Sequence, residues 1–164
     1  MAEETQPKWE GRATAELKGS TAEQIWPFLE DFCNIDKFYP NLDKCYRVEG
    51  TPGQPGLVRH CATKIGWANE KLLTIDRTNR CLNYEVLENT AGFKNYVATL
   101  KVLPTEGDGE PAGCKIEWSF IAGPFEGWRL EDLVSHRDYC LQFMAKKMED
   151  AIKAQIYMVT CVSP

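Results

Sequence analysis

The sequence predicts an α+β fold in which a seven-stranded curved antiparallel sheet is covered by one long C-terminal helix. Strand-like segments separated by short turns fill most of residues 43–121, after one alternating segment near the N-terminus. An apolar stripe at helical spacing then runs from Trp128 to Ala154. The 164 residues suffice to bury one substantial core, so we expect a single domain over 1–164, with its core at about 8–154.

The first strand is expected at residues 9–17, WEGRATAEL, because small or apolar residues alternate there with polar ones. Ser20 followed by Glu23 is a capping-box pattern, which predicts that a helix begins here. Pro27 lies inside this segment and lacks an N–H, so the helix should be kinked or short.

A second short helix is expected within NIDKFYPNL, where Pro40 ends it. Six strands should follow, separated by turn-forming glycine, proline and asparagine residues. Their segments are CYRVEG, LVRHCATK, WANEKLLTIDRT, CLNYEVLE, FKNYVATLKVL and CKIEWSFIA.

No proline or glycine interrupts the final helix between Trp128 and Ala154. The tail, residues 155–164, has strand-like composition but no evident partner, and the pattern does not assign it. One helix fills a curved sheet poorly unless many large side chains project inward, so the pattern is compatible with a cavity between the two layers. The apolar stripe of the helix consists of Leu130, Leu133, Val134, Leu141, Met144, Met148 and Ile152.

Composition argues against several classes of function. The net charge is −5 and the basic residues are scattered, so we expect no nucleic-acid partner. No apolar run approaches the length of a membrane span, and the acidic start MAEETQPKWE does not resemble a signal peptide. These observations favour a cytoplasmic protein.

Cysteine and histidine patterns predict neither a disulfide framework nor a zinc site. The seven cysteines are odd in number and widely spaced, and none forms a C-x-x-C pair. The two histidines, His60 and His136, are expected to be structural or surface groups. There is also no glycine-rich phosphate loop, G-x-S-x-G or H-E-x-x-H motif, so we expect no metal or other cofactor.

Strand parity identifies the side chains that should face the interior. In three of the predicted strands the parity is clear, and it places Tyr84, Tyr96 and Trp118 on the inward face. The inward rows are Leu82, Tyr84 and Val86; Tyr96, Ala98, Leu100 and Val102; and Ile116, Trp118 and Phe120.

Parity does not settle the orientation of Arg59 and Glu70, which share faces with Leu57 and Leu72, respectively. They form either an exposed cross-strand pair worth less than about 1 kcal/mol or a pair inside the cavity. In the second case Glu70 would act as a general acid or base, and Arg59 would stabilise a developing oxyanion. Such a pair suits isomerisation, elimination or cyclisation of a small, largely apolar substrate.

Several segments resemble plant lachrymatory factor synthase and its relatives, which adopt the helix-grip fold. That fold is shared by birch pollen allergens, START-type lipid-binding domains, bacterial polyketide cyclases and abscisic acid receptors. The resemblance extends from about Lys8 to Ile152, although the segment between Arg59 and Glu70 is shorter here. The matching segments are KWEGRATA, EQIWPFLEDFCNIDKFYPNL, GLVRHC, WANEKLLTID, NYVATLKV and WSF.

The resemblance implies an internal apolar cavity with Arg59 and Glu70 as the catalytic pair. Tyr84 and Tyr96 match two pocket tyrosines of the synthase. The resemblance further implies a cofactor-independent isomerase, lyase or cyclase. The alternatives are a carrier of a small hydrophobic molecule and a ligand-gated regulator in which TPGQPG is a mobile loop. The residues expected to contact the ligand are Trp118, Phe120, Leu57, Leu72, Phe38 and Leu133.

Overall fold

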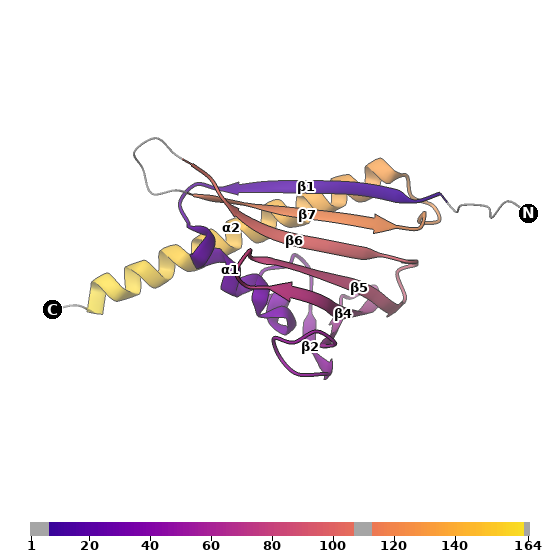
Figure 1. The fold of residues 1–164 in the computed structure, drawn as a ribbon, viewed down its shortest axis with the longest axis horizontal. Helices are drawn as coiled ribbons and strands as arrows, with labels where there is room; N and C mark the ends of the chain where they lie inside the picture. The colour runs from indigo at the N-terminus through magenta and orange to yellow at the C-terminus, as the bar shows by residue number, and fades with distance from the viewer. Residues whose placement is uncertain (1–6, 107–112, 163–164) are drawn as a thin grey trace, which may run out of the picture.

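The computed structural model describes residues 7–106 and 113–162, and in this part of the chain it contains one seven-stranded antiparallel sheet (Figure 1). The strands lie in the order β1-β7-β6-β5-β4-β3-β2, which confirms the predicted curved sheet. They span β1 Trp9–Leu17, β2 Lys44–Glu49, β3 Val58–Ala62, β4 Trp67–Asp76, β5 Cys81–Asn89, β6 Val97–Pro104 and β7 Cys114–Ala122.

Irregular pairing bends the sheet around its middle strands. The register between β4 and β5 shifts twice, between Ala68 and Glu70 and between Leu72 and Thr74. A shift of this kind inserts an extra residue, which increases the local twist and redirects the neighbouring side chains. Glu70 therefore lies between two irregular points of β4.

The first helix, α1 (Ala22–Glu30), begins one residue later than its predicted capping pattern. The cap is Thr21, whose hydroxyl accepts a hydrogen bond from the Gln24 backbone N–H at 3.2 Å. The Gln24 side chain in turn accepts from the Thr21 N–H at 2.8 Å. The predicted box of Ser20 and Glu23 was therefore wrong by one position, because Thr21 and Gln24 offer the same pair of hydrogen bonds.

The second short helix is a 3₁₀ helix, η1 (Phe32–Lys37), which starts before the predicted segment. It follows α1 directly, and Pro40 lies just beyond it. Phe32 and Ile35 are its buried residues, so η1 is held to the body of the protein by two apolar side chains.

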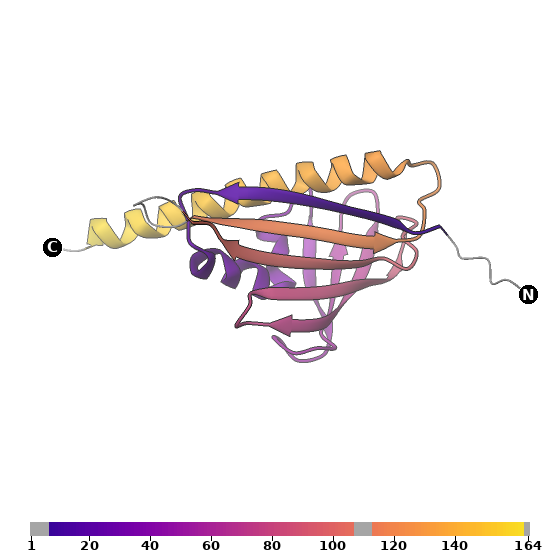
Figure 2. The ribbon, with the colours of Figure 1, turned by 45° about the horizontal axis from the view of Figure 1, so that its top comes forward.

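The long helix, α2 (Leu130–Val162), lies along β1 and β7 and continues through residues that the sequence pattern left unassigned. Its last turns project beyond the end of the sheet, whereas its first turns lie over the strands (Figures 1 and 2). No proline or glycine lies between its ends, so nothing in the chain terminates the helix where the apolar stripe ends. In the described residues, no helix has both the length and the apolar character needed to cross a bilayer.

The inward rows predicted from parity form the core. Ala98, Leu100 and Val102 of β6 are 0–6 % exposed, and the inward residues of β7 are 0–4 % exposed. The buried stripe of α2 and the buried residues of α1 and η1 complete this core. The elements therefore form two layers, with helices over one face of a bent sheet.

Candidate functional site

A cavity of about 850 Å³ lies between α2, the α1–η1 segment and the inward face of the sheet. Its apolar wall includes Phe32 of η1, Leu100 and Trp118 of the sheet, and Leu133 and Met144 of α2. Its rim is formed by the β3–β4 turn, the β5–β6 loop and the residues preceding β2. This volume is in the range of cavities that enclose a small organic molecule.

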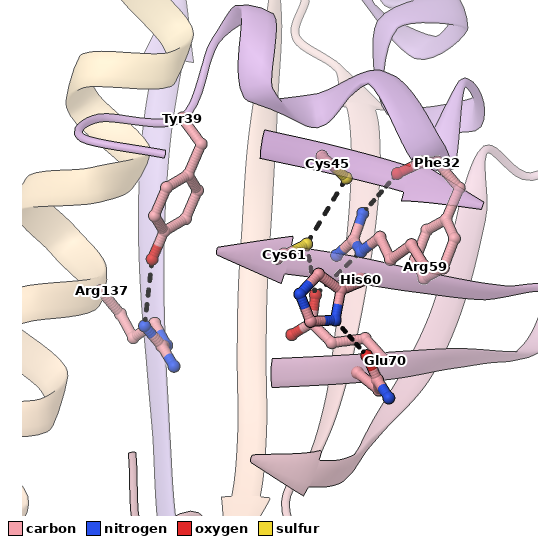
Figure 3. A network of polar contacts seen from close by, with 9 residues as sticks. Phe32, Tyr39, Cys45, Arg59, His60, Cys61, Glu70 and Arg137 are labelled. Atoms are coloured by element: carbon pink, nitrogen blue, oxygen red, sulfur yellow. Dashed lines mark hydrogen bonds and ion pairs between the residues drawn. The ribbon is translucent and has the colours of Figure 1, made fainter. Parts of the chain in front are cut away.

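Arg59 and Glu70 both line this cavity and form an ion pair. They are directly opposite each other on β3 and β4, and Arg59 Nε donates to Glu70 Oε1 at 2.8 Å. Their side chains are only 6 % and 16 % exposed (Figure 3). The structure therefore places the pair in the interior, as the resemblance implied, and rules out the alternative of an exposed strand pair.

Three further contacts fix the guanidinium of Arg59. Its Nη1 donates to the backbone carbonyl of Phe32 at 2.7 Å, and its Cζ lies 3.7 Å from the centre of the Phe32 ring. The centre of the Tyr84 ring lies 5.0 Å from the same Cζ. Burial acts to lower the pKa of Arg59, but the Glu70 carboxylate raises it, so the guanidinium remains charged.

Two cysteines extend the polar network away from Glu70. Cys61, beside Arg59 on β3, donates its thiol to Glu70 Oε1 at 3.6 Å, and its sulfur lies 3.5 Å from that of Cys45 on β2. The contact with Cys45 and burial raise the pKa of Cys61, so it is a neutral thiol donor. Glu70 Oε1 thus accepts from both Arg59 and Cys61, whereas no hydrogen bond to Oε2 is found among the described residues.

The two predicted tyrosines occupy different positions. Tyr84 lines the cavity from β5, and burial raises the pKa of its phenol well above the usual value. Tyr96, just before β6, is 1 % exposed and lies outside the lining. It stacks on Phe120 at 5.7 Å and accepts a hydrogen bond from Arg137 at 2.8 Å.

Arg137 of α2 is a second buried arginine on the cavity wall, and sequence reasoning missed it. It is 6 % exposed, and among the described residues no carboxylate lies within 4.0 Å of its guanidinium. A signal was present in the sequence, because Arg137 is four residues from both Leu133 and Leu141 of the apolar stripe. A charge at that position lies on the buried face of a helix.

The predicted ligand-contacting residues divide into two groups. Trp118 and Leu133 line the cavity, whereas the other four are buried but lie outside its lining. Phe120 faces β1 and α2, where it would lie 2.7 Å from a Cβ at Gly11. The remaining three, Phe38, Leu57 and Leu72, belong to the surrounding hydrophobic core.

The two histidines lie in different surroundings. The ring of His60 packs at a tilt against Tyr46 and Trp67, at 5.1 and 5.3 Å between ring centres, and its Nδ1 lies 2.7 Å from Asn69 Oδ1. His136 is at the cavity, where its Nδ1 lies 3.4 Å from Arg137 Nη1. Across the described residues, no group of three or more histidine, cysteine or acidic side chains is placed to hold a metal ion.

Comparison with known proteins identifies the family. Residues 8–156 match the family described as polyketide cyclase/dehydrase and lipid transport. The structure is similar to the protein XoxI from Bacillus cereus, with a TM-score of 0.68 and 22 % identity over 86 % of this chain and 94 % of that one. It is also similar to an uncharacterised protein from Bacillus thuringiensis, with a TM-score of 0.66 and 20 % identity over 87 % and 97 % of the two chains. At these identities the structural matches support the helix-grip fold, and the extent of the family match shows that this chain belongs to the polyketide cyclase/dehydrase and lipid transport family.

Proposed function

We propose that this protein is a cofactor-independent proton-transfer enzyme of the lachrymatory factor synthase-like type. It would act as an isomerase, lyase or cyclase on a small, largely apolar molecule. The observation that supports this proposal best is the Arg59–Glu70 pair, which is held inside the protein on the wall of a cavity of about 850 Å³. A charged pair on an apolar wall is costly to bury, and such placement is typical of groups that act on a ligand.

In this proposal each group has a distinct role. Glu70 Oε2, the carboxylate oxygen with no bond among the described residues, would accept a proton from the substrate and return it to a second atom of the same molecule. Arg59 Nη2 has no hydrogen bond in the same part of the chain and would donate to the oxygen on which negative charge develops. The neutral Tyr84 hydroxyl, also on the wall, would orient that oxygen. The proton returns within one substrate, so the reaction requires no oxidant or reductant.

A carrier function is the second candidate, and the completeness of the ion pair favours it. Arg59 and Glu70 satisfy each other's charge without a ligand, and Phe32 supplies a further acceptor. In a carrier the pair would be a fixed polar feature of the wall, and the ligand would leave unchanged.

The decisive experiment compares wild-type protein with Glu70→Gln. Compounds that co-purify are extracted, identified by mass spectrometry and returned to each protein in deuterated water. We expect the wild type to convert the ligand or to introduce deuterium into it, because the proton that Glu70 takes up can exchange with solvent before it is returned to the substrate. Glu70→Gln keeps the size of the side chain but removes the base, so it should bind the ligand without either change.

The matched control is Glu88→Gln, which makes the same substitution at an exposed position of β5. It should behave like the wild type. Conversion or deuterium incorporation at the wild-type rate in Glu70→Gln would exclude the role given to Glu70. Tight binding with neither conversion nor exchange in the wild type would instead establish the carrier.

A further inference from the structure

Arg137 carries a positive charge that the described part of the protein leaves without a carboxylate partner. The charges of Arg59 and Glu70 compensate each other, and the remaining acidic residue on the lining, Asp43, is exposed at the rim. Arg137 is 6 % exposed, so bulk water does not solvate it freely. A buried guanidinium without a counter-ion destabilises the fold, so its presence in the cavity wall calls for a functional explanation.

The neighbours of Arg137 are neutral. Its Nε donates to the Tyr96 hydroxyl at 2.8 Å, and its Nη1 lies 3.4 Å from both the Tyr39 hydroxyl and His136 Nδ1 (Figure 3 shows the contact with Tyr39). Burial raises the pKa of both phenols, so neither supplies a negative charge. Burial and the charge of Arg137 lower the pKa of His136, which favours the neutral imidazole. These groups position the guanidinium without compensating its charge.

The orientation of Arg137 favours a flat monoanion. Three aromatic rings surround the guanidinium carbon, at 5.4 Å for Phe93, 5.2 Å for Tyr96 and 4.9 Å for Trp118. They fix the plane of the guanidinium, and Nη2 makes no hydrogen bond within the described residues. A guanidinium held in this way matches the two oxygens of a carboxylate. A phosphate dianion would call for more than one uncompensated positive group, and the other such group on the described lining, Lys64, is exposed at the rim, whereas Arg137 is buried.

We propose that Arg137 is the anion-binding group of the cavity and that the natural ligand is a small, largely apolar molecule carrying one carboxylate. The carboxylate would pair with Arg137 on the α2 side, and the apolar body would fill the space toward Glu70 on β4. This inference rests on the proposed small-molecule function of the cavity. It adds the chemical class of the ligand and its direction of binding, and it holds for an enzyme and for a carrier.

The test uses probes that share one apolar chain and differ in charge. Decanoate, decanol and methyl decanoate each compete with the fluorescent dye phenylnaphthylamine, for wild type, Arg137→Gln and Arg137→Lys. We expect decanoate to displace the dye from the wild type at lower concentration than its methyl ester. Arg137→Gln should lower the affinity for decanoate roughly 10- to 100-fold, which corresponds to the loss of a charge-assisted hydrogen-bonded pair. The same substitution should change the affinity for decanol less than about 2-fold. Arg137→Lys retains the charge and should keep part of the preference for decanoate.

The control is Arg12→Gln, which removes an equal charge from an exposed position of β1 and should leave the affinity for every probe unchanged. Equal losses for decanoate and decanol in Arg137→Gln would mean that Arg137 only supports the shape of the wall, and would overturn the inference. Wild-type protein that binds the methyl ester as well as decanoate would overturn it too, even if Arg137→Gln does not fold. If neither the dye nor any probe binds the wild type, the proposed cavity function itself fails.

Discussion

At the scale of single residues, the burial of Arg59 needs a physical explanation. The guanidinium has lost nearly all contact with solvent, and it regains one carboxylate, one backbone carbonyl and the face of Phe32. Buried pairs of this kind rarely stabilise a fold more than apolar residues of similar size would. The pair is therefore better explained by a function at the cavity than by its contribution to folding.

A double-mutant cycle tests this explanation. Arg59→Met leaves the Glu70 carboxylate without its partner, and we expect a loss of about 3 kcal/mol in the free energy of unfolding, measured by urea denaturation. Arg59→Met combined with Glu70→Leu should recover most of that loss, because both charges are then replaced by apolar groups. A double variant as unstable as the sum of the two single variants would show that the pair acts as two independent structural contacts.

Sequence predicted some of these residues well and others poorly, for reasons that lie in the strand geometry. Tyr84 and Trp118 sit on strands whose rows alternate cleanly, so parity placed them on the inward face, and both line the cavity. Parity gave no answer for Arg59 and Glu70, because polar and apolar residues occur on both faces of β3 and β4. Arg137 is missed because the apolar stripe of the helix is read from its hydrophobic residues alone, and a charged residue on the same face does not enter that pattern.

At the scale of elements, the contact between β1 and α2 depends on a glycine. Gly11 belongs to the inward face of β1, and a Cβ at this position would lie 2.7 Å from both the Phe120 ring and Val134 of α2. The missing side chain lets the helix approach the sheet closely at this end. That approach brings the first half of α2, including Arg137, over the strands.

Adding a side chain at this point should loosen the contact. Gly11→Ala introduces a methyl group where the ring of Phe120 and the side chain of Val134 already meet, and we expect it to cost about 1–3 kcal/mol in unfolding free energy. Gly19→Ala is the control, because a Cβ there has no atom within 4 Å. It should be neutral or slightly stabilising. Equal effects of the two substitutions in thermal denaturation would contradict the close approach inferred at Gly11.

The limits of element prediction follow from local chemistry. Two adjacent cap-forming residues, Ser20 and Thr21, left the start of α1 uncertain by one position. The pattern left residues 155–162 unassigned because they are rich in strand-forming types, and the structure continues α2 through them. In both places, two local preferences of similar strength competed, and sequence alone could not rank them.

At the scale of the whole molecule, the interior is filled unevenly. Near β1 and β7, α2 packs directly on the sheet, whereas toward β3, β4 and β5 the helix and η1 leave the cavity. Two cross-strand partners illustrate the difference. Leu82 of β5 and Leu100 of β6 face each other, yet Leu100 lines the cavity at 6 % exposed and Leu82 lies in the packed core at 0 %.

Enlarging each of these leucines should therefore have opposite consequences. Leu82→Phe must displace packed neighbours, so we expect it to cost about 1–3 kcal/mol in unfolding free energy while leaving phenylnaphthylamine affinity close to the wild-type value. Leu100→Phe can extend into the cavity, so its unfolding free energy should stay within about 1 kcal/mol of wild type while the affinity for the dye falls. Urea denaturation and dye titration of the two variants measure both quantities. A destabilised Leu100→Phe with unchanged dye binding would show that the space beside Leu100 is not the space that the ligand occupies. If instead Leu82→Phe loses stability but keeps dye affinity, and Leu100→Phe keeps stability but loses dye affinity, the protein retains an unfilled interior for its ligand beside Leu100.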